Sequence, residues 1–168
     1  ATVLSTSPSG EERFGEAVAL DQRRLLVGVP NDSEAGFTAG AAYLFTNPGD
    51  SWEWELERKF LSPDASAGDH FGSSVAIDGD VFVVGASDEE GYGQESGGIY
   101  IYRRDVSGVD PWVLARSQYI ADGGENDRLG ESVAVSRDIV LAGMPLAEAG
   151  NEEPSGRAFV FGQDEGGP

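Results

Sequence analysis

Carboxylates are the one class of reactive side chain that this sequence offers in quantity. Its 30 Asp and Glu residues stand against 11 Lys and Arg residues, one His and no Cys. Carboxylates can bind hard cations, pair with basic partners, or act as acid and base when two are held at a fixed separation. Thiolate chemistry and a disulfide framework both need cysteine and are therefore excluded.

Many of these carboxylates lie in short polar segments between apolar stretches, where a ligand could reach them. The candidate ligand-binding residues are Asp32, Glu34, Asp88, Glu89, Glu90, Glu148, Glu152 and Glu153, joined by the aromatic residues Phe37 and Tyr92. Catalysis would need a nucleophile beside a base, a metal triad or two placed carboxylates, and no such pattern stands out. We expect a binding surface or a merely solvated acidic face, and no enzyme.

Net charge and hydropathy remove two further classes of partner. A net charge of −19 repels nucleic acid and anionic membranes. No apolar run approaches the roughly 20 residues of a membrane-spanning helix. We therefore expect neither nucleic-acid binding nor a membrane span.

The elements that must position the carboxylates repeat about every 57 residues. The dipeptides Phe14-Gly15, Phe71-Gly72 and Leu129-Gly130 each open a similar segment, and a second glycine follows thirteen residues later at Gly28, Gly85 and Gly143. A fixed period of this length indicates one supersecondary unit used repeatedly. The only histidine, His70, lines up with Arg13 and Arg128 and is therefore not expected to act as a general base.

Each unit contains four segments with strand character. In the first unit they are residues 16–21, 24–30, 40–46 and 54–61. The first segment alternates polar and apolar residues, the second is continuously apolar, the third has alternate aromatics, and the fourth is charged. The counterparts of the first segment are 73–78 and 131–136. Repeated four-stranded antiparallel units predict an all-β protein made of β-propeller blades.

The repeated residues resemble the FG-GAP repeat. The resemblance rests on Phe-Gly before the first strand and on Gly-Val-Pro (28–30), Gly-Ala-Ser (85–87) and Gly-Met-Pro (143–145) after the second. The family builds the propeller of integrin α-subunits and of many bacterial extracellular proteins, so the resemblance implies an extracellular or cell-surface location. The glycines are expected where backbones approach closely near the propeller axis.

The chain departs from this family between the first and second strands. Many FG-GAP repeats carry a calcium loop of the type Asp-x-Asp-x-Asp-Gly there. In this chain the connection shrinks to residues 21–23, 78–80 and 136–138, with at most two carboxylates each. Calcium needs six to eight oxygen ligands. We therefore expect no cofactor or metal in these turns, and calcium bound elsewhere stays an open alternative.

Alternating strand directions should place the strand 2–3 and strand 4–1 connections on one acidic face and the short turns on the opposite face. Three functions remain open for this loop face. The first is an extracellular binding or adhesion module that engages a protein or another copy of itself, and the second is a lectin-type propeller with sugar pockets. The third is a structural building block of a larger assembly. Phe37 and Tyr92 could serve a sugar site, but the third repeat has no matching aromatic residue.

The repeats form a single expected domain over residues 1–168, with repeats at 14–61, 71–120 and 129–162. Residues 1–7 line up with a fourth strand, and the third repeat lacks its own fourth strand. Propellers typically have four to eight blades. We expect a homodimeric six-bladed propeller in which residues 1–7 complete the partner's third blade. A fragment of a longer propeller and a head-to-tail filament are the alternatives.

Overall fold

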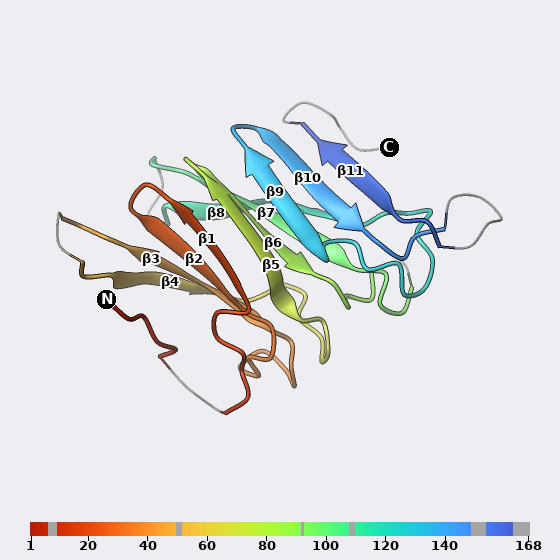
Figure 1. Cartoon of the computed structure of the whole chain (residues 1–168), viewed down its shortest axis with the longest axis horizontal. Coiled ribbons are helices and arrows are strands. Elements are labelled where there is room, and N and C mark those ends of the chain that lie inside the picture. The colour runs from red at the N-terminus through yellow and green to blue at the C-terminus, as the bar shows by residue number, and fades with distance from the viewer. Residues whose placement is uncertain (7–9, 50–51, 92, 108–109, 149–153, 163–168) are drawn as a thin grey trace.

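The computed structural model describes residues 1–6, 10–49, 52–91, 93–107, 110–148 and 154–162, and all that follows concerns these residues. Within them the chain forms eleven strands and no helix, so the predicted all-β fold is confirmed. The strands make two four-stranded sheets and one three-stranded sheet, all antiparallel (Figure 1). No helix that could cross a membrane occurs in this part of the chain.

Each sheet is built from one repeat, with its strands in chain order. The first sheet contains β1 (Ala17–Asp21), β2 (Arg24–Val29), β3 (Ala41–Thr46) and β4 (Glu55–Phe60). The second contains β5 (Phe71–Asp78), β6 (Val81–Ala86), β7 (Gly98–Arg104) and β8 (Trp112–Gln118). The third contains β9 (Ser132–Ser136), β10 (Ile139–Met144) and β11 (Arg157–Phe161). The predicted first strands agree with β1, β5 and β9 to within two residues.

Two-residue turns join the first and second strands of every sheet. Asp21 pairs with Arg24, Asp78 with Val81, and Ser136 with Ile139. The first turn residue has a positive φ in each case: Gln22 (50°), Gly79 (56°) and Arg137 (55°). Such turns match the twist of a hairpin. The short connections expected from the sequence are therefore present.

These turns also link successive sheets. Asp21 Oδ2 accepts a hydrogen bond from the backbone amide of Gly79 (2.8 Å), and Asp78 Oδ2 accepts one from Arg137 (2.6 Å). The two carboxylates that stand where the family's calcium loop begins thus fix the turn of the next repeat. Their partners are backbone amides, which suits an acceptor-only side chain.

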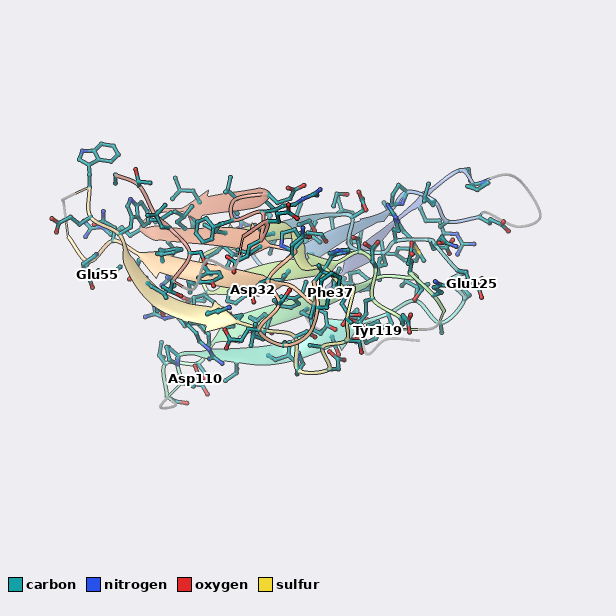
Figure 2. The ribbon with its side chains drawn as sticks, turned by 90° about the horizontal axis from the view of Figure 1, so that it is seen from below. Asp32, Phe37, Glu55, Asp110, Tyr119 and Glu125 are labelled. Carbon is teal, nitrogen blue, oxygen red and sulfur yellow. The ribbon has the colours of Figure 1, made fainter. Side chains whose placement is uncertain are left out.

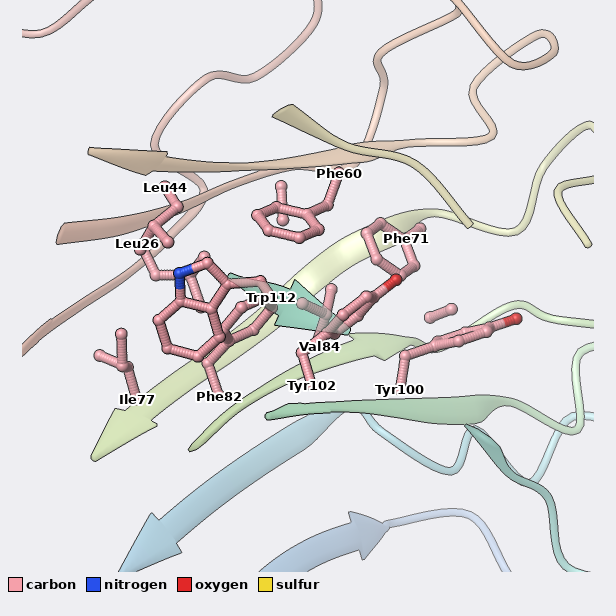
Figure 3. Packing of buried hydrophobic residues seen from close by; sticks show 12 residues of the cluster. Leu26, Leu44, Phe60, Phe71, Ile77, Phe82, Val84, Tyr100, Tyr102 and Trp112 are labelled. Atoms are coloured by element: carbon pink, nitrogen blue, oxygen red, sulfur yellow. The ribbon is translucent and has the colours of Figure 1, made fainter. Parts of the chain in front are cut away.

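The three sheets stack in chain order, with their first strands side by side. β5 contacts both β1 and β9. Between the first and second sheets, Leu26, Leu44 and Phe60 face an aromatic layer that includes Phe82 and Trp112 (Figure 3). The rings of Phe60 and Phe82 meet edge to face with their centroids 4.9 Å apart. This arrangement of aromatic pairs adds stability beyond the buried area alone.

Two further apolar clusters complete the core. Between the second and third sheets, Val83 and Ile101 pack with Leu129, Val140 and Met144. The third cluster lies on the other side of the first sheet. Its buried members are Val27, Val29, Ala41, Tyr43 and Phe45, and residues such as Val3 and Phe14 pack against them. Apolar residues therefore also cover the face of the first sheet that points away from the second sheet.

Glycine permits the closest approach between sheets. A Cβ on Gly28 would lie 2.0 Å from the carbonyl oxygen of Gly72, and one on Gly85 would lie 2.2 Å from that of Gly130. Both distances exclude any side chain, so the predicted close approach is confirmed for these two pairs. For Gly15 and Gly143 it is wrong within the single chain. No described atom other than its chain neighbours lies within 4 Å of the Gly15 Cβ position, and the three atoms nearest to the Gly143 Cβ position all belong to Ser132 of its own sheet.

The N-terminal segment differs from its expected form. Residues 1–6 form no strand in the single chain, and residue 7 lies outside the described residues. The segment nevertheless lies on the first sheet, because Val3 packs against the cluster around Tyr43 and Phe45. A strand needs a regular series of backbone hydrogen bonds with a neighbouring strand, and none of the eleven strands pairs with this segment.

The glycine contact predicts a specific loss of stability. Gly28→Ala should lower the free energy of unfolding by about 1–3 kcal/mol, because the new methyl group overlaps the Gly72 backbone. Gly49→Ala is the control, since no atom lies within 4 Å of its Cβ position and a change within about 0.5 kcal/mol is expected. Denaturant unfolding followed by circular dichroism measures both. If the two substitutions lowered the free energy of unfolding equally, the close contact of Gly28 with Gly72 would not be what limits the approach of the sheets.

Candidate loop-face binding surface

The long connections emerge on one side of the sheet stack, opposite the two-residue turns. We define the loop face as the segment before β1 together with the β2–β3, β4–β5, β6–β7, β8–β9 and β10–β11 connections. Figure 2 shows Asp32, Phe37, Tyr119 and Glu125 on these connections. Neighbouring loops are joined by backbone hydrogen bonds, from Gly68 to Phe37 (3.0 Å) and from Asn126 to Gln94 (2.8 Å). The face is therefore a connected surface and not a set of independent loops.

Asp32 and Glu34 are occupied by a lysine of their own chain. Asp32 Oδ2 accepts from Lys59 Nζ (2.6 Å) and from the Tyr43 hydroxyl (3.3 Å), and Glu34 Oε2 also accepts from Lys59 Nζ (2.7 Å). Burial alone would lower the pKa of Lys59, but these two hydrogen bonds outweigh it and raise the pKa above its usual value. Asp32 is buried, so it supports the loop and does not present a carboxylate to a ligand.

Asp88 links two other loops. One of its oxygens contacts His70 Nδ1, and the other lies 3.5 Å from Arg128 Nε. The hydrogen bond with His70 lowers the pKa of Asp88, and the charge of Arg128 adds to the effect. Since His70 belongs to the β4–β5 connection and Arg128 to the β8–β9 connection, Asp88 holds the loops of different repeats together.

Glu89 belongs to a partly buried cluster of carboxylates and tyrosines. Its Oε2 accepts from the Tyr100 hydroxyl (3.1 Å), which also lies 2.7 Å from Asp64 Oδ1 and 2.9 Å from the Tyr119 hydroxyl. Burial, followed by the nearby charge of Asp69, raises the pKa of Glu89 to about 8. Burial likewise raises the pKa of Asp69. At neutral pH this cluster holds a proton that ordinary carboxylates would have released.

The remaining predicted residues divide into exposed and undescribed ones. Phe37 is 77% exposed, and Glu90 and Glu148 are exposed as well. Tyr92, Glu152 and Glu153 lie outside the described residues. Of the carboxylates singled out from the sequence, Glu90 and Glu148 are thus exposed, Glu34 is shared with Lys59, and the others in the described part of the chain are internal.

A small central pocket on the loop face was not predicted. Its volume is about 210 Å³, and all three repeats line it with equivalent positions. The lining residues are Arg13, Glu16, Pro30, Asn31, His70, Ser73, Ser87, Asp88, Arg128 and Glu131. The alignment of Arg13, His70 and Arg128 was visible in the sequence, and all three have φ between 55° and 58°. Their shared backbone conformation turns the chain into the pocket at the same point of each repeat.

The described residues contain no group of three or more His, Asp or Glu side chains arranged to hold a metal ion. Several carboxylates of the loop face are instead held by lysine, histidine, arginine and tyrosine side chains of the same chain. A ligand of this face would therefore meet a polar surface of mixed charge around the pocket, with the exposed ring of Phe37 at some distance along the loops.

The raised pKa of Glu89 predicts how stability depends on pH. The folded chain binds a proton that the unfolded chain releases above about pH 4.5, so stability should fall as pH rises from about 4.5 to about 8. Glu89→Gln keeps the shape of the side chain but removes the titratable carboxyl group. The free energy of unfolding of this variant should therefore depend less on pH. Urea unfolding across this pH range measures it, with the exposed Glu90→Gln as control. An unchanged pH dependence in Glu89→Gln would refute the assignment.

Comparison with known proteins supports the repeat seen in the sheets. The FG-GAP repeat matches residues 5–45, 54–102 and 120–161. Each match covers the first three strands of one sheet, and the second match also includes β4 of the first sheet. No curated protein matches the chain significantly. Since the matches cover most of the sequence, this chain belongs to the FG-GAP repeat family.

Proposed function

We propose that this protein is a non-catalytic binding module of the extracellular space or cell surface, with the loop face as its interaction surface. The observation that carries the proposal is the joined set of loops around a central pocket to which all three repeats contribute. Loops held by a rigid scaffold are where proteins place variable binding residues.

The sheets are proposed to be blades of a β-propeller. Two features of the stack support this. The first strands of successive sheets lie side by side, and the same glycine contact repeats between successive sheets. Three blades are too few for a ring. We propose that two chains supply six blades as a homodimer; further repeats in a longer chain and a filament of the same units are the alternatives.

The proposed ligand is a protein surface carrying basic groups. The chain has a net charge of −19, and the exposed Glu90 and Glu148 lie on the loop face. Phe37 offers an exposed ring on which a lysine or arginine side chain can stack. A lectin is the weaker alternative, because the central pocket has no aromatic lining residue on which a sugar ring could rest.

Binding of a lysine-rich peptide at physiological salt tests the loop face. Glu90→Lys and Phe37→Ala should each weaken binding several-fold, since an exposed charge pair contributes about 0.2–1 kcal/mol and a ring contact a similar amount. Isothermal titration calorimetry gives the affinities. Because any acidic protein attracts a cationic peptide, the position of the change has to be separated from net charge.

Glu55→Lys is the matched control for that purpose. Glu55 is exposed at the start of β4, on the side of the molecule opposite the loops (Figure 2). The proposal requires Glu55→Lys to bind nearly as well as the unaltered chain. If Glu55→Lys and Glu90→Lys weaken binding equally, attraction is due to net charge and the loop face has no special role.

A further inference from the structure

The third sheet leaves an apolar surface open that the second sheet buries. Val83 and Ile101 pair across β6 and β7 and are 0% and 5% exposed, because the third sheet covers them. Leu141 and Val160 pair across β10 and β11 in the same register, yet they are 42% and 65% exposed. With Ile139, we call these residues the open C-side face.

The first sheet leaves the complementary surface open. Ile77 of β5 is 8% exposed, because it packs into the cluster shared with the first sheet. Leu20 holds the same place in β1, as the pairs Leu20–Leu25 and Ile77–Phe82 show, and it is 64% exposed. With Val18, which is equally exposed, and Gly15, we call this the open N-side face. Each internal junction joins a C-side surface to an N-side surface.

The glycines carry the same pattern. Gly28 and Gly85, on the C-side of the first two sheets, receive the backbone of Gly72 and Gly130 from the next sheet. Gly143 holds the equivalent place on the open C-side face. Gly15 is equivalent to Gly72 and Gly130, and its φ of 91° matches theirs of 96° and 86°. Both halves of the close contact are thus formed on the chain, at opposite ends of the stack.

A backbone bridge also recurs at each junction. Gly40 bridges to Phe71, and Gly97 bridges to Leu129, both in parallel orientation. The amide of Phe71 donates to the carbonyl oxygen of Ala39, and that of Leu129 to Ser96, both at 2.9 Å. These bonds fix the height of one sheet against the next.

The third sheet carries the acceptor half of this bridge. Gly156 donates to Ala147 O (3.0 Å), as Gly40 donates to Asp32 O and Gly97 to Glu89 O (2.9 Å each). Its φ of 75° is also close to the 90° and 80° of those glycines. Phe14 holds the place of Phe71 and Leu129 in front of the first sheet. Gly156 and Phe14 are therefore the matching halves of a third bridge.

We infer that a second copy of this chain docks its open N-side face on the open C-side face, and that two copies close into a ring through two such junctions. The inference rests on the proposed assembly of blades and names the surfaces that perform it. The partner follows from continuity with the internal junctions: the surface known to fit a C-side face is an N-side face, and the chain carries one of each. A contact between unlike faces closes when the rotation returns to its start.

The N-terminal segment fits the same junction. Phe60 of β4 packs against Phe82 and Tyr102 of the following sheet. Val3 packs in the corresponding way on the cluster around Phe45 of the first sheet. The segment thus lies where the outer strand of a preceding blade would lie, beside the outer edge of a partner's β11. Pairing along that edge would also protect an exposed strand from aggregation.

Sedimentation equilibrium of the full chain and two variants tests the inference. The unaltered chain should sediment at twice its own mass, and Val160→Lys should sediment as a folded monomer, because its site is already exposed in the single chain. Val106→Lys is the matched control, since Val106 is 80% exposed on the β7–β8 connection, away from both open faces, and should leave the dimer intact. A monomeric unaltered chain, or a ladder of larger species, would overturn the inference.

A mixing experiment tests that the two faces differ. Leu20→Lys should also be monomeric, and at high concentration an equal mixture with Val160→Lys should form two-chain species, because each variant keeps the face that the other has lost. Absence of mixed dimers, or a dimer that survives Leu20→Lys, would overturn the contact between unlike faces. If Val160→Lys fails to fold by circular dichroism, Ile139→Lys tests the same face.

The two proposals fail separately. Monomeric Val160→Lys should still bind the lysine-rich peptide, because the loops of its three repeats are unchanged. Peptide binding without dimers would leave the loop face standing and remove the ring. Dimers without peptide binding would leave the ring standing and remove the loop face as the binding surface.

Discussion

The closeness of successive backbones is the constraint on which the rest of the structure depends. Gly28 lies against Gly72, and Gly85 against Gly130, at distances that no side chain would tolerate. Because the sheets meet there, their first strands lie side by side and the apolar residues of neighbouring sheets interlock. The same contact sets the height at which each loop leaves its sheet. Loops of different repeats can therefore bond to one another and enclose a shared pocket.

The acidic character of the chain has two different physical roles. Some carboxylates are internal partners: Asp32 accepts from Lys59, Asp88 from His70, and Asp21 and Asp78 from backbone amides of the next repeat. Others remain exposed and give the molecule its field, which acts on partners at a distance. Burying a carboxylate is costly unless it is hydrogen-bonded, and the buried Asp32 is bonded to both Lys59 and Tyr43. The number of acidic residues in the sequence therefore overestimates the number of carboxylates that a ligand can reach.

The sequence predicted the sheets well because period, apolar alternation and turn residues all indicated the same unit. It placed the strand 2–3 loops on one face, but it could not show that Lys59, far along the chain, would neutralise Asp32 and Glu34. That pairing depends on the register of β3 and β4. The alignment of Arg13, His70 and Arg128 was visible, but its meaning as a pocket lining depends on how the sheets converge. That Gly15 and Gly143 lack the contact between sheets that their counterparts make likewise becomes evident only when the internal junctions can be compared with the ends of the stack.

The central claim is that the junction seen twice within the chain forms again between copies. An experimental structure of the 168-residue protein in its solution assembly tests this most directly. The account predicts two copies related by a two-fold axis, with Gly15 of one against Gly143 of the other and Leu141 and Val160 buried between them. An assembly in which these residues remain exposed to solvent in every copy would contradict it.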